Sequence, residues 1–216
     1  MQQFTTSQKL KILFSFPVIV AALGYFVDIY DLLLFGIVRV PSLKSMDINP
    51  DVAGTMIINF QMTGLLLGGI LWGILGDKKG RLSVLFGSIL VYSVANIACG
   101  FLPQMDFADK ATVYAALRFI AGIGLAGELG AGITLVSESL PKELRAIGTS
   151  MVAGFGLLGA VVAQLTVELA GDWTIAYFIG GGLGLMLLLL RVGVFESGLY
   201  KQLEKKAAIS KGNFLS

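Results

Sequence analysis

Four ionisable side chains lie deep within apolar stretches of the sequence. Asp28 and Asp31 fall in the first stretch, and Arg118 and Glu128 fall in a later one. Each such residue costs roughly 2.5–3.5 kcal/mol at the centre of a membrane on insertion scales. We therefore expect these side chains to face one another or water, where carboxylates beside a guanidinium are suited to binding protons or an anion.

The spacing of the four residues predicts which of them meet. Asp28 and Asp31 are three residues apart and so share one face of a helix. Counted along their spans from the outer ends, Asp31 and Arg118 lie roughly 14 Å and 10 Å deep, with Glu128 about 15 Å further along. These similar depths predict an Asp31–Arg118 pair. Its role is either proton coupling and substrate contact or, alternatively, only the pinning of two helices together.

Carboxylates outnumber cations in this set. Three carboxylates and one guanidinium cannot all be comfortably ionised in a buried site. At least one of the acids is therefore expected to bind a proton near neutral pH, as a proton-coupling site requires.

The elements that hold these residues are six apolar runs. The chain has 216 residues, of which 56% are hydrophobic and only 14% charged, whereas a soluble domain carries about 25% charged residues. A span needs roughly 20 apolar residues, and the runs lie near residues 14–40, 53–75, 82–103, 111–138, 146–168 and 173–194. We expect an all-α membrane protein, with a six-helix bundle over residues 1–194 and a charged cytoplasmic helix or linker over 195–216. The first run lacks a cleavage site and is expected to be retained.

Lysine and arginine predict the orientation of the bundle. The ends expected on one side hold twelve of them: Lys9, Lys11, Lys78, Lys79, Arg81, Lys142, Arg145, Arg191, Lys201, Lys205, Lys206 and Lys211. The opposite ends hold three: Arg39, Lys44 and Lys110. By the positive-inside rule both termini are cytoplasmic. Trp173 and Tyr114 fall near the outer boundary, where amphipathic rings favour the interface.

Several classes of protein are excluded or disfavoured. The sequence has no histidine and a single cysteine, Cys99, so it predicts no metal site and no disulfide framework. No nucleophile–base pair is present, and we expect neither an enzyme nor a cofactor. A net charge of +2 is too small for a nucleic-acid-binding surface.

Glycines at short spacings are expected to let helices approach closely. They include Gly122-x-Gly124-x-x-Gly127, which matches a dinucleotide fingerprint but lies within an apolar span rather than between a strand and a helix. Three pairs have the G-x-x-x-G spacing typical of membrane helix packing: Gly64–Gly68, Gly69–Gly73 and Gly180–Gly184.

The stretch Gly73-Ile-Leu-Gly-Asp77-Lys-Lys-Gly80-Arg81 resembles the signature loop between the second and third helices of the major facilitator superfamily. We expect Asp77 at the N-terminal end of the third span, where a carboxylate meets the positive end of the helix dipole. Arg118-Phe-Ile-Ala-Gly122-Ile-Gly124 resembles the fourth-helix motif of the same superfamily.

A second cytoplasmic segment carries the same resemblance. The stretch from Glu138 to Arg145 resembles E-x-x-P-x-x-x-R of sugar porters. The resemblance implies a cytoplasmic gating network that latches the outward-facing state, built from Gly73, Asp77, Gly80, Arg81, Glu138 and Arg145.

Two further stretches indicate which group within the superfamily the sequence resembles. Tyr30-Asp31-Leu-Leu-Leu-Phe35-Gly36 and Ala126-Gly127-Glu128-Leu-Gly130 resemble motifs of metabolite:proton symporters. The fifth span lacks the mid-helix glutamines with which sugar porters bind hydroxyls, and its Gln164 lies only near the outer end.

The resemblance implies the N-terminal half of a twelve-helix secondary transporter, with its six helices arranged as 3+3 inverted repeats. It implies proton-coupled symport of a small polar or anionic metabolite at the inner membrane. In this interpretation Asp31 carries the proton, Asp28 tunes it, Arg118 alternately pairs Asp31 and attracts substrate, and Glu128 is a second candidate site. The expected partners are membrane lipid and either a missing C-terminal six-helix half or a second copy.

Three alternatives remain open at this point. One is a non-transporting membrane scaffold that kept the fold, and another is a half-transporter that acts only as a dimer. An ion channel is disfavoured by the lack of a repeated polar face.

Overall fold

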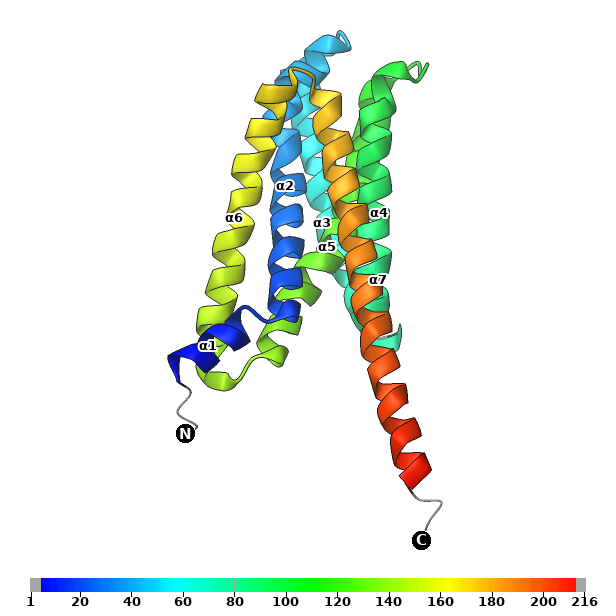
Figure 1. Cartoon of the computed structure of the whole chain (residues 1–216). Coiled ribbons are helices and arrows are strands. Elements are labelled where there is room, and N and C mark those ends of the chain that lie inside the picture. The colour runs from blue at the N-terminus through cyan, green and yellow to red at the C-terminus, as the bar shows by residue number, and fades with distance from the viewer. Residues whose placement is uncertain (1–4, 80, 213–216) are drawn as a thin grey trace.

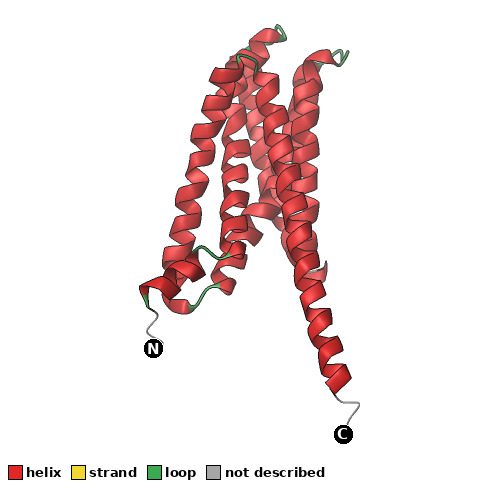
Figure 2. Ribbon diagram, in the orientation of Figure 1, coloured by secondary structure: helices red, strands yellow, loops and turns green. Residues whose placement is uncertain are grey.

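The computed structural model describes the backbone of residues 5–79 and 81–212. It describes their side chains except at 17, 79, 81–82, 129–139 and 194–212. Six long helices dominate this part of the chain: α2 (Phe16–Ser45), α3 (Pro50–Lys79), α4 (Arg81–Phe101), α5 (Lys110–Ser139), α6 (Arg145–Ala170) and α7 (Trp173–Gly212). They run up and down in one elongated bundle (Figure 1), and the described residues are helices and short connections (Figure 2). The six predicted runs are confirmed as helices.

Shorter elements lie at the ends of the bundle. α1 (Thr6–Leu13) begins with a capping box formed by Thr5 and Gln8, and it lies across the lower end in Figure 1. The 3₁₀ turns η1 (Leu102–Gln104) and η2 (Lys142–Leu144) precede α5 and α6 respectively. We call the end that holds α1 the near end, and the end with the loops at 46–49, 105–109 and 171–172 the far end.

Length and composition fit a membrane. Five described stretches are long and apolar enough to cross a bilayer: Val18–Ser45, Pro50–Lys78, Ser83–Gln104, Lys142–Ala170 and Trp173–Gly193. α5 is as long as α3 but is not among these five, and it carries Arg118 and Glu128 in the part whose side chains are described.

Side-chain caps and a glycine form the helix ends at the far end of the bundle. Asn49 caps α3 by accepting from the backbone N–H of Asp51 at 2.9 Å. Asp109 accepts from the N–H of Thr112 at 3.1 Å, and its hydrogen bonds to Thr112 hold the pKa of this exposed carboxyl below its usual value. Gly171 ends α6 with a φ of 66°, in the left-handed region that glycine adopts freely. The connection expected between the runs near 146–168 and 173–194 is confirmed.

Two predicted boundaries are wrong. α2 runs to Ser45 and holds Pro41 inside it, whereas the first run was expected to end near residue 40. α3 continues to Lys79, so Asp77 lies in its last turn rather than at the N-terminus of α4. In both cases polar residues extend the helix beyond its apolar run. The charged tail continues α7, which is one helix to Gly212 in the described part of the chain.

The helices pack as two related triplets. α3 packs most extensively on α5, and α6 packs in the corresponding way on α2. α2 runs from the near end to the far end, whereas α5 runs the opposite way. These paired contacts fit the 3+3 inverted arrangement, in which α2–α4 correspond to α5–α7.

Glycines make the close helix crossings, as predicted. A Cβ on Gly64 would overlap the backbone oxygen of Phe119 on α5, and one on Gly159 would overlap that of Phe26 on α2. A Cβ on Gly124 would lie 2.6 Å from the backbone nitrogen of Tyr92. The pair Gly69–Gly73 is the exception, since a Cβ at either position would have nothing within 4 Å.

An aromatic cluster fills the far end of the interior. Tyr114, Trp173 and Tyr177 lie in one buried core, and the indole nitrogen of Trp173 donates to Ser45 at 3.0 Å. The rings of Tyr114 and Trp173 are thus buried among helices rather than placed toward an interface, which corrects the sequence expectation. Tyr30 donates to the backbone oxygen of Ala176 at 2.9 Å, which ties α2 to α7.

Candidate functional site

A buried guanidinium lies at the centre of the bundle. Arg118 is 0% exposed. Its Nη1 donates to Asp31 Oδ1 at 3.2 Å and to Asn96 Oδ1 at 2.7 Å, and its Nη2 donates to the backbone oxygen of Asp31 at 3.1 Å. Its Nε donates to Gln61 Oε1 at 3.3 Å. The predicted Asp31–Arg118 pair is therefore confirmed as a contact.

Five of the long helices contribute to this site. Arg118 lies on α5, Asp31 on α2, Gln61 on α3 and Asn96 on α4. The guanidinium carbon also lies 5.6 Å from the ring centre of Tyr177 on α7. A buried cation needs both a counter-charge and hydrogen-bond acceptors, and this arrangement supplies them from three helices, α2, α3 and α4.

Three members of the site were not predicted from the sequence: Gln61, Asn96 and Tyr177. Gln61 and Asn96 are amides within otherwise apolar spans, and that signal would have found them. The predicted equality of depth was also inexact. Asp31 lies fourteen residues, or roughly 21 Å, from the end of α2, against roughly 12 Å for Arg118 on α5. Because α5 crosses the bundle obliquely (Figure 1), counting along the helices does not measure depth.

A second buried ion pair lies nearer the amino end of α2. Arg191 Nη1 donates to Glu128 Oε2 at 2.6 Å, and the second nitrogen, Nη2, donates to Glu128 Oε1. Glu128 is 1% exposed and Arg191 6%. Arg191 was expected only among the cations at the ends of the bundle, and its pairing with Glu128 was not predicted. It lies two residues from the end of the apolar stretch Trp173–Gly193.

Asp28 lies between the two ion pairs along α2. It is 1% exposed, and its Oδ1 has no hydrogen-bond partner among the described residues. Its charged neighbours are Glu128, Arg191 and Asp31. All four residues selected from the sequence therefore lie in one buried region.

The described members of the predicted gating network lie at or near the near end. Gly73 and Asp77 are exposed on α3. Arg145 Nε donates to the backbone oxygen of Leu140 at 3.0 Å, which closes the link between α5 and α6. Gly80 and the side chains of Arg81 and Glu138 lie outside the described part of the chain, so the network itself stays a prediction.

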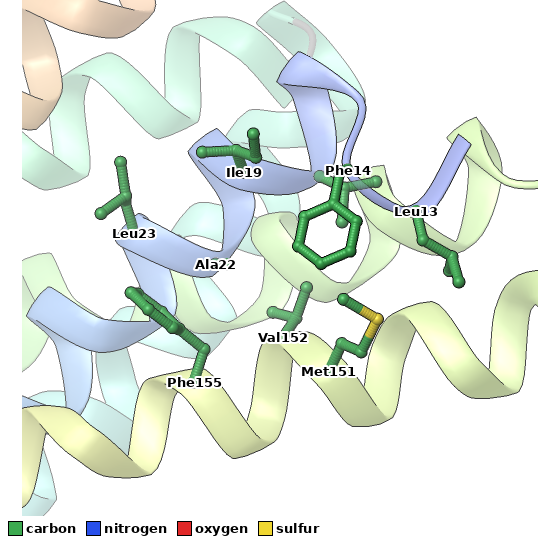
Figure 3. Close-up of a pocket in the computed structure, with 9 residues that line it drawn as sticks. Leu13, Phe14, Ile19, Ala22, Leu23, Met151, Val152 and Phe155 are labelled. Atoms are coloured by element: carbon green, nitrogen blue, oxygen red, sulfur yellow. The ribbon is translucent and has the colours of Figure 1, made fainter. Parts of the chain in front are cut away.

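An apolar pocket lies apart from the charged region, at the near end. Leu13, Phe14 and Ile19 face Met151, Val152 and Phe155 across it (Figure 3), and its volume is about 150 Å³. Its walls belong to α1, α2, α6 and the α1–α2 link, and they carry no charged side chain, so a polar metabolite has no partner there. Among the described residues, no group of three or more His, Cys, Asp or Glu side chains gathers to hold a metal ion.

Comparison with known families identifies the fold. Residues 15–211 match the Major Facilitator Superfamily. The chain belongs to this family. It is 33% identical over 165 residues to the niacin transporter of Acinetobacter baylyi. The aligned region covers 75% of this chain and 36% of the relative. It is 32% identical over 193 residues to a putative metabolite transport protein of Haemophilus influenzae, covering 88% and 45%.

A third relative is the gentisate transporter of Corynebacterium glutamicum, 32% identical over 150 residues, covering 68% of this chain and 32% of the relative. These proteins are transporters rather than enzymes, and the chain spans less than half of their length. This major facilitator chain also superposes on solved structures. A D-xylose–proton symporter matches with a TM-score of 0.67 at 17% identity, covering 89% of this chain and 52% of the symporter. That likeness shows the six-helix half of the fold.

Proposed function

We propose that this chain is the N-terminal half of a proton-coupled symporter that imports a small organic anion. The observation that carries the proposal is the buried Asp31–Arg118 pair, which is held by side chains from five helices. A buried pair of this kind is weak evidence for stability, whereas ionisable groups at membrane depth commonly mark substrate and proton pathways.

The ion pair couples a proton to an anion because the proton binds Asp31 and the anion then takes the place of Asp31 beside Arg118. A proton bound by Asp31 removes the negative charge that holds Arg118. The released guanidinium then attracts a carboxylate, with which it forms bidentate hydrogen bonds. When the anion leaves, Arg118 returns to Asp31 and the proton is expelled. Asp28 and Glu128 set the charge around this exchange.

Relatives support the class of substrate. The names of several are those of carboxylic acids: niacin, benzoate, gentisate and shikimate. Such acids are anions near neutral pH. Gln164, the glutamine of the fifth span, is exposed and donates to Glu168 at 2.8 Å. This pairing supports an anion rather than a sugar as the substrate.

The orientation and the gate complete the proposal. We infer that the protein lies in the inner membrane with both termini in the cytoplasm, because twelve cations are expected at one set of helix ends. The near end, where Arg145 closes the α5–α6 link, is then cytoplasmic. Gly73, Asp77, Gly80, Arg81, Glu138 and Arg145 form the gate there.

A second six-helix unit supplies the other wall of the transport path. Among the five apolar spans, those of α3 and α6 have the smallest share of buried residues. In their apolar windows 22% and 28% of residues are buried, compared with 56% for α2. Exposed Leu66 and Ile70 on α3, and Leu157 and Val161 on α6, are free to pack against it. This unit is either a C-terminal half or a second copy, and the even number of spans puts two copies in the same orientation.

Uptake into proteoliposomes tests the function. The protein is reconstituted with its second six-helix unit, or as the assembly it forms by itself, and an inward proton gradient is applied. Labelled niacin, benzoate, gentisate and shikimate are compared with xylose. The proposal predicts accumulation of at least one acid, abolished by a proton ionophore. Gradient-independent flux, or no uptake of any acid by either assembly, would contradict it.

A further inference from the structure

Glu128 and Arg191 form a buried pair that the exchange at Asp31 does not use. Both guanidinium Nη atoms of Arg191 bond to the two carboxylate oxygens of Glu128, one of them at 2.6 Å. Bidentate pairing of this kind is the strongest form of an arginine–carboxylate contact. Arg191 is therefore committed to Glu128 in the state described by the structure.

Glycine on α2 makes room for this pair. A Cβ on Gly24 would overlap Arg191 Nη2 and would lie 2.5 Å from Glu128 Oε1. Asp28 follows Gly24 by one turn and so lies on the same face of α2. The ion pair thus lies directly beside the helix face that carries Asp28.

Asp28 is left without a cation of its own. Arg118 bonds to Asp31, and Arg191 bonds to Glu128. Another polar neighbour is Tyr92 on α4, which is 0% exposed and whose hydroxyl has no partner among the described residues. Asp51, Asp77 and Lys78 on α3, and Arg145 and Glu168 on α6, are exposed, so those two helices bring no described charge to Asp28.

Two carboxylates beside one guanidinium leave one negative charge in excess. A buried carboxylate that lacks both a cation and a hydrogen-bond donor is strongly unfavourable unless it binds a proton. We propose that Asp28 holds a resident proton in this state, with Arg191 as the positioning residue that keeps Glu128 ionised. The inference rests on the proposed function only in assigning this proton to transport.

The transport step follows from the neighbouring atoms. Asp31 Oδ2 also lacks a hydrogen-bond partner among the described residues, so it is available to accept a proton. Transfer from Asp28 to Asp31 leaves Asp28 as a carboxylate near Arg191, and makes Asp31 a neutral acid that no longer holds Arg118 by charge. One proton moves and no other bond is made or broken.

Infrared spectroscopy of the purified chain in detergent tests this inference. A protonated carboxyl has a C=O stretch that carboxylates lack, and exposed acids are ionised at neutral pH. We expect one such band in the wild-type protein, its loss in Asp28→Asn, and a shifted band in Asp28→Glu. Arg191→Gln removes the cation from Glu128 and should double the band area. Asp109→Asn, which alters an exposed acid, should leave the band unchanged.

The outcomes separate this inference from the proposed function, because the band is measured without substrate or gradient. A wild-type protein without the band, or an Asp28→Asn variant that keeps it, would overturn the resident proton even if uptake is intact. A band that behaves as expected in a protein without proton-driven uptake would retain the proton site and reject the transport proposal.

Discussion

Asp31 accepts twice from Arg118, through Oδ1 at 3.2 Å and through its backbone oxygen at 3.1 Å. The two contacts differ in what they respond to. The first depends on the charge of the carboxylate, whereas the second remains when that charge is removed. Neutralising Asp31 therefore weakens the hold on Arg118 without removing every partner of the guanidinium.

The first prediction is a double-mutant cycle on this pair. Asp31→Asn leaves Arg118 buried without a counter-charge and should lower the free energy of unfolding by about 3–5 kcal/mol. Asp31→Asn combined with Arg118→Gln should cost less than the sum of the single changes. Thermal unfolding in detergent, followed by circular dichroism, gives the comparison. Additive effects would show that the two side chains are not coupled.

The second prediction concerns the crossing of α3 and α5. Gly64→Ala should destabilise the bundle by about 1–3 kcal/mol, because the added methyl overlaps the backbone of Phe119. Gly69→Ala, on the same helix, should be neutral or stabilising by about 0.5–1 kcal/mol, because its Cβ has nothing within 4 Å. The same unfolding measurement applies, and equal effects of the two changes would contradict the packing described.

The third prediction concerns the second ion pair. Gly24→Ala forces Arg191 and Glu128 to move and should cost about 1–3 kcal/mol. Gly36→Ala is the matched control on α2, since its Cβ would have nothing within 4 Å. Unfolding curves in denaturant compare the two variants. A Gly24→Ala variant as stable as Gly36→Ala would place the pair elsewhere.

The fourth prediction concerns Tyr30. Its hydroxyl donates to the backbone oxygen of Ala176 at 2.9 Å and lies 2.9 Å from Thr166 Oγ1. Tyr30→Phe should cost about 1–3 kcal/mol, because a buried acceptor loses its donor. Tyr25→Phe should stay within about 0.5 kcal/mol of wild type. Calorimetry in detergent measures both, and a neutral Tyr30→Phe would refute the role of these bonds.

Hydrophobic runs were sufficient to predict six helices, and glycine spacing predicted most close crossings. The cost of burying charge predicted that Asp31 and Arg118 meet. Patterning did not reveal Arg191, because a cation beside the end of an apolar run is indistinguishable from an interfacial anchor. Only the folded structure, in which α7 packs on α4 and α2, shows that this side chain turns inward to Glu128.

Helix ends were harder for a related reason. From the sequence, the first span was expected to end near residue 40 and the second near residue 75, since proline and charge usually mark turns. α2 and α3 continue past those positions to Ser45 and Lys79.

Glycine pairs also differ by context, because Gly64 and Gly68 face α5 whereas Gly69 and Gly73 face no described neighbour. Spacing alone does not say which face of α3 is covered.

Accumulation and exchange can be measured separately on Asp31→Asn in proteoliposomes that hold the complete transport assembly. Wild type should concentrate a labelled carboxylate under an inward proton gradient and also exchange it without a gradient. Asp31→Asn should lose at least about tenfold in accumulation, the equivalent of roughly 1.4 kcal/mol, while retaining exchange, and Asp109→Asn should match wild type. If Asp31→Asn accumulates the carboxylate as wild type does, Asp31 does not couple protons to transport.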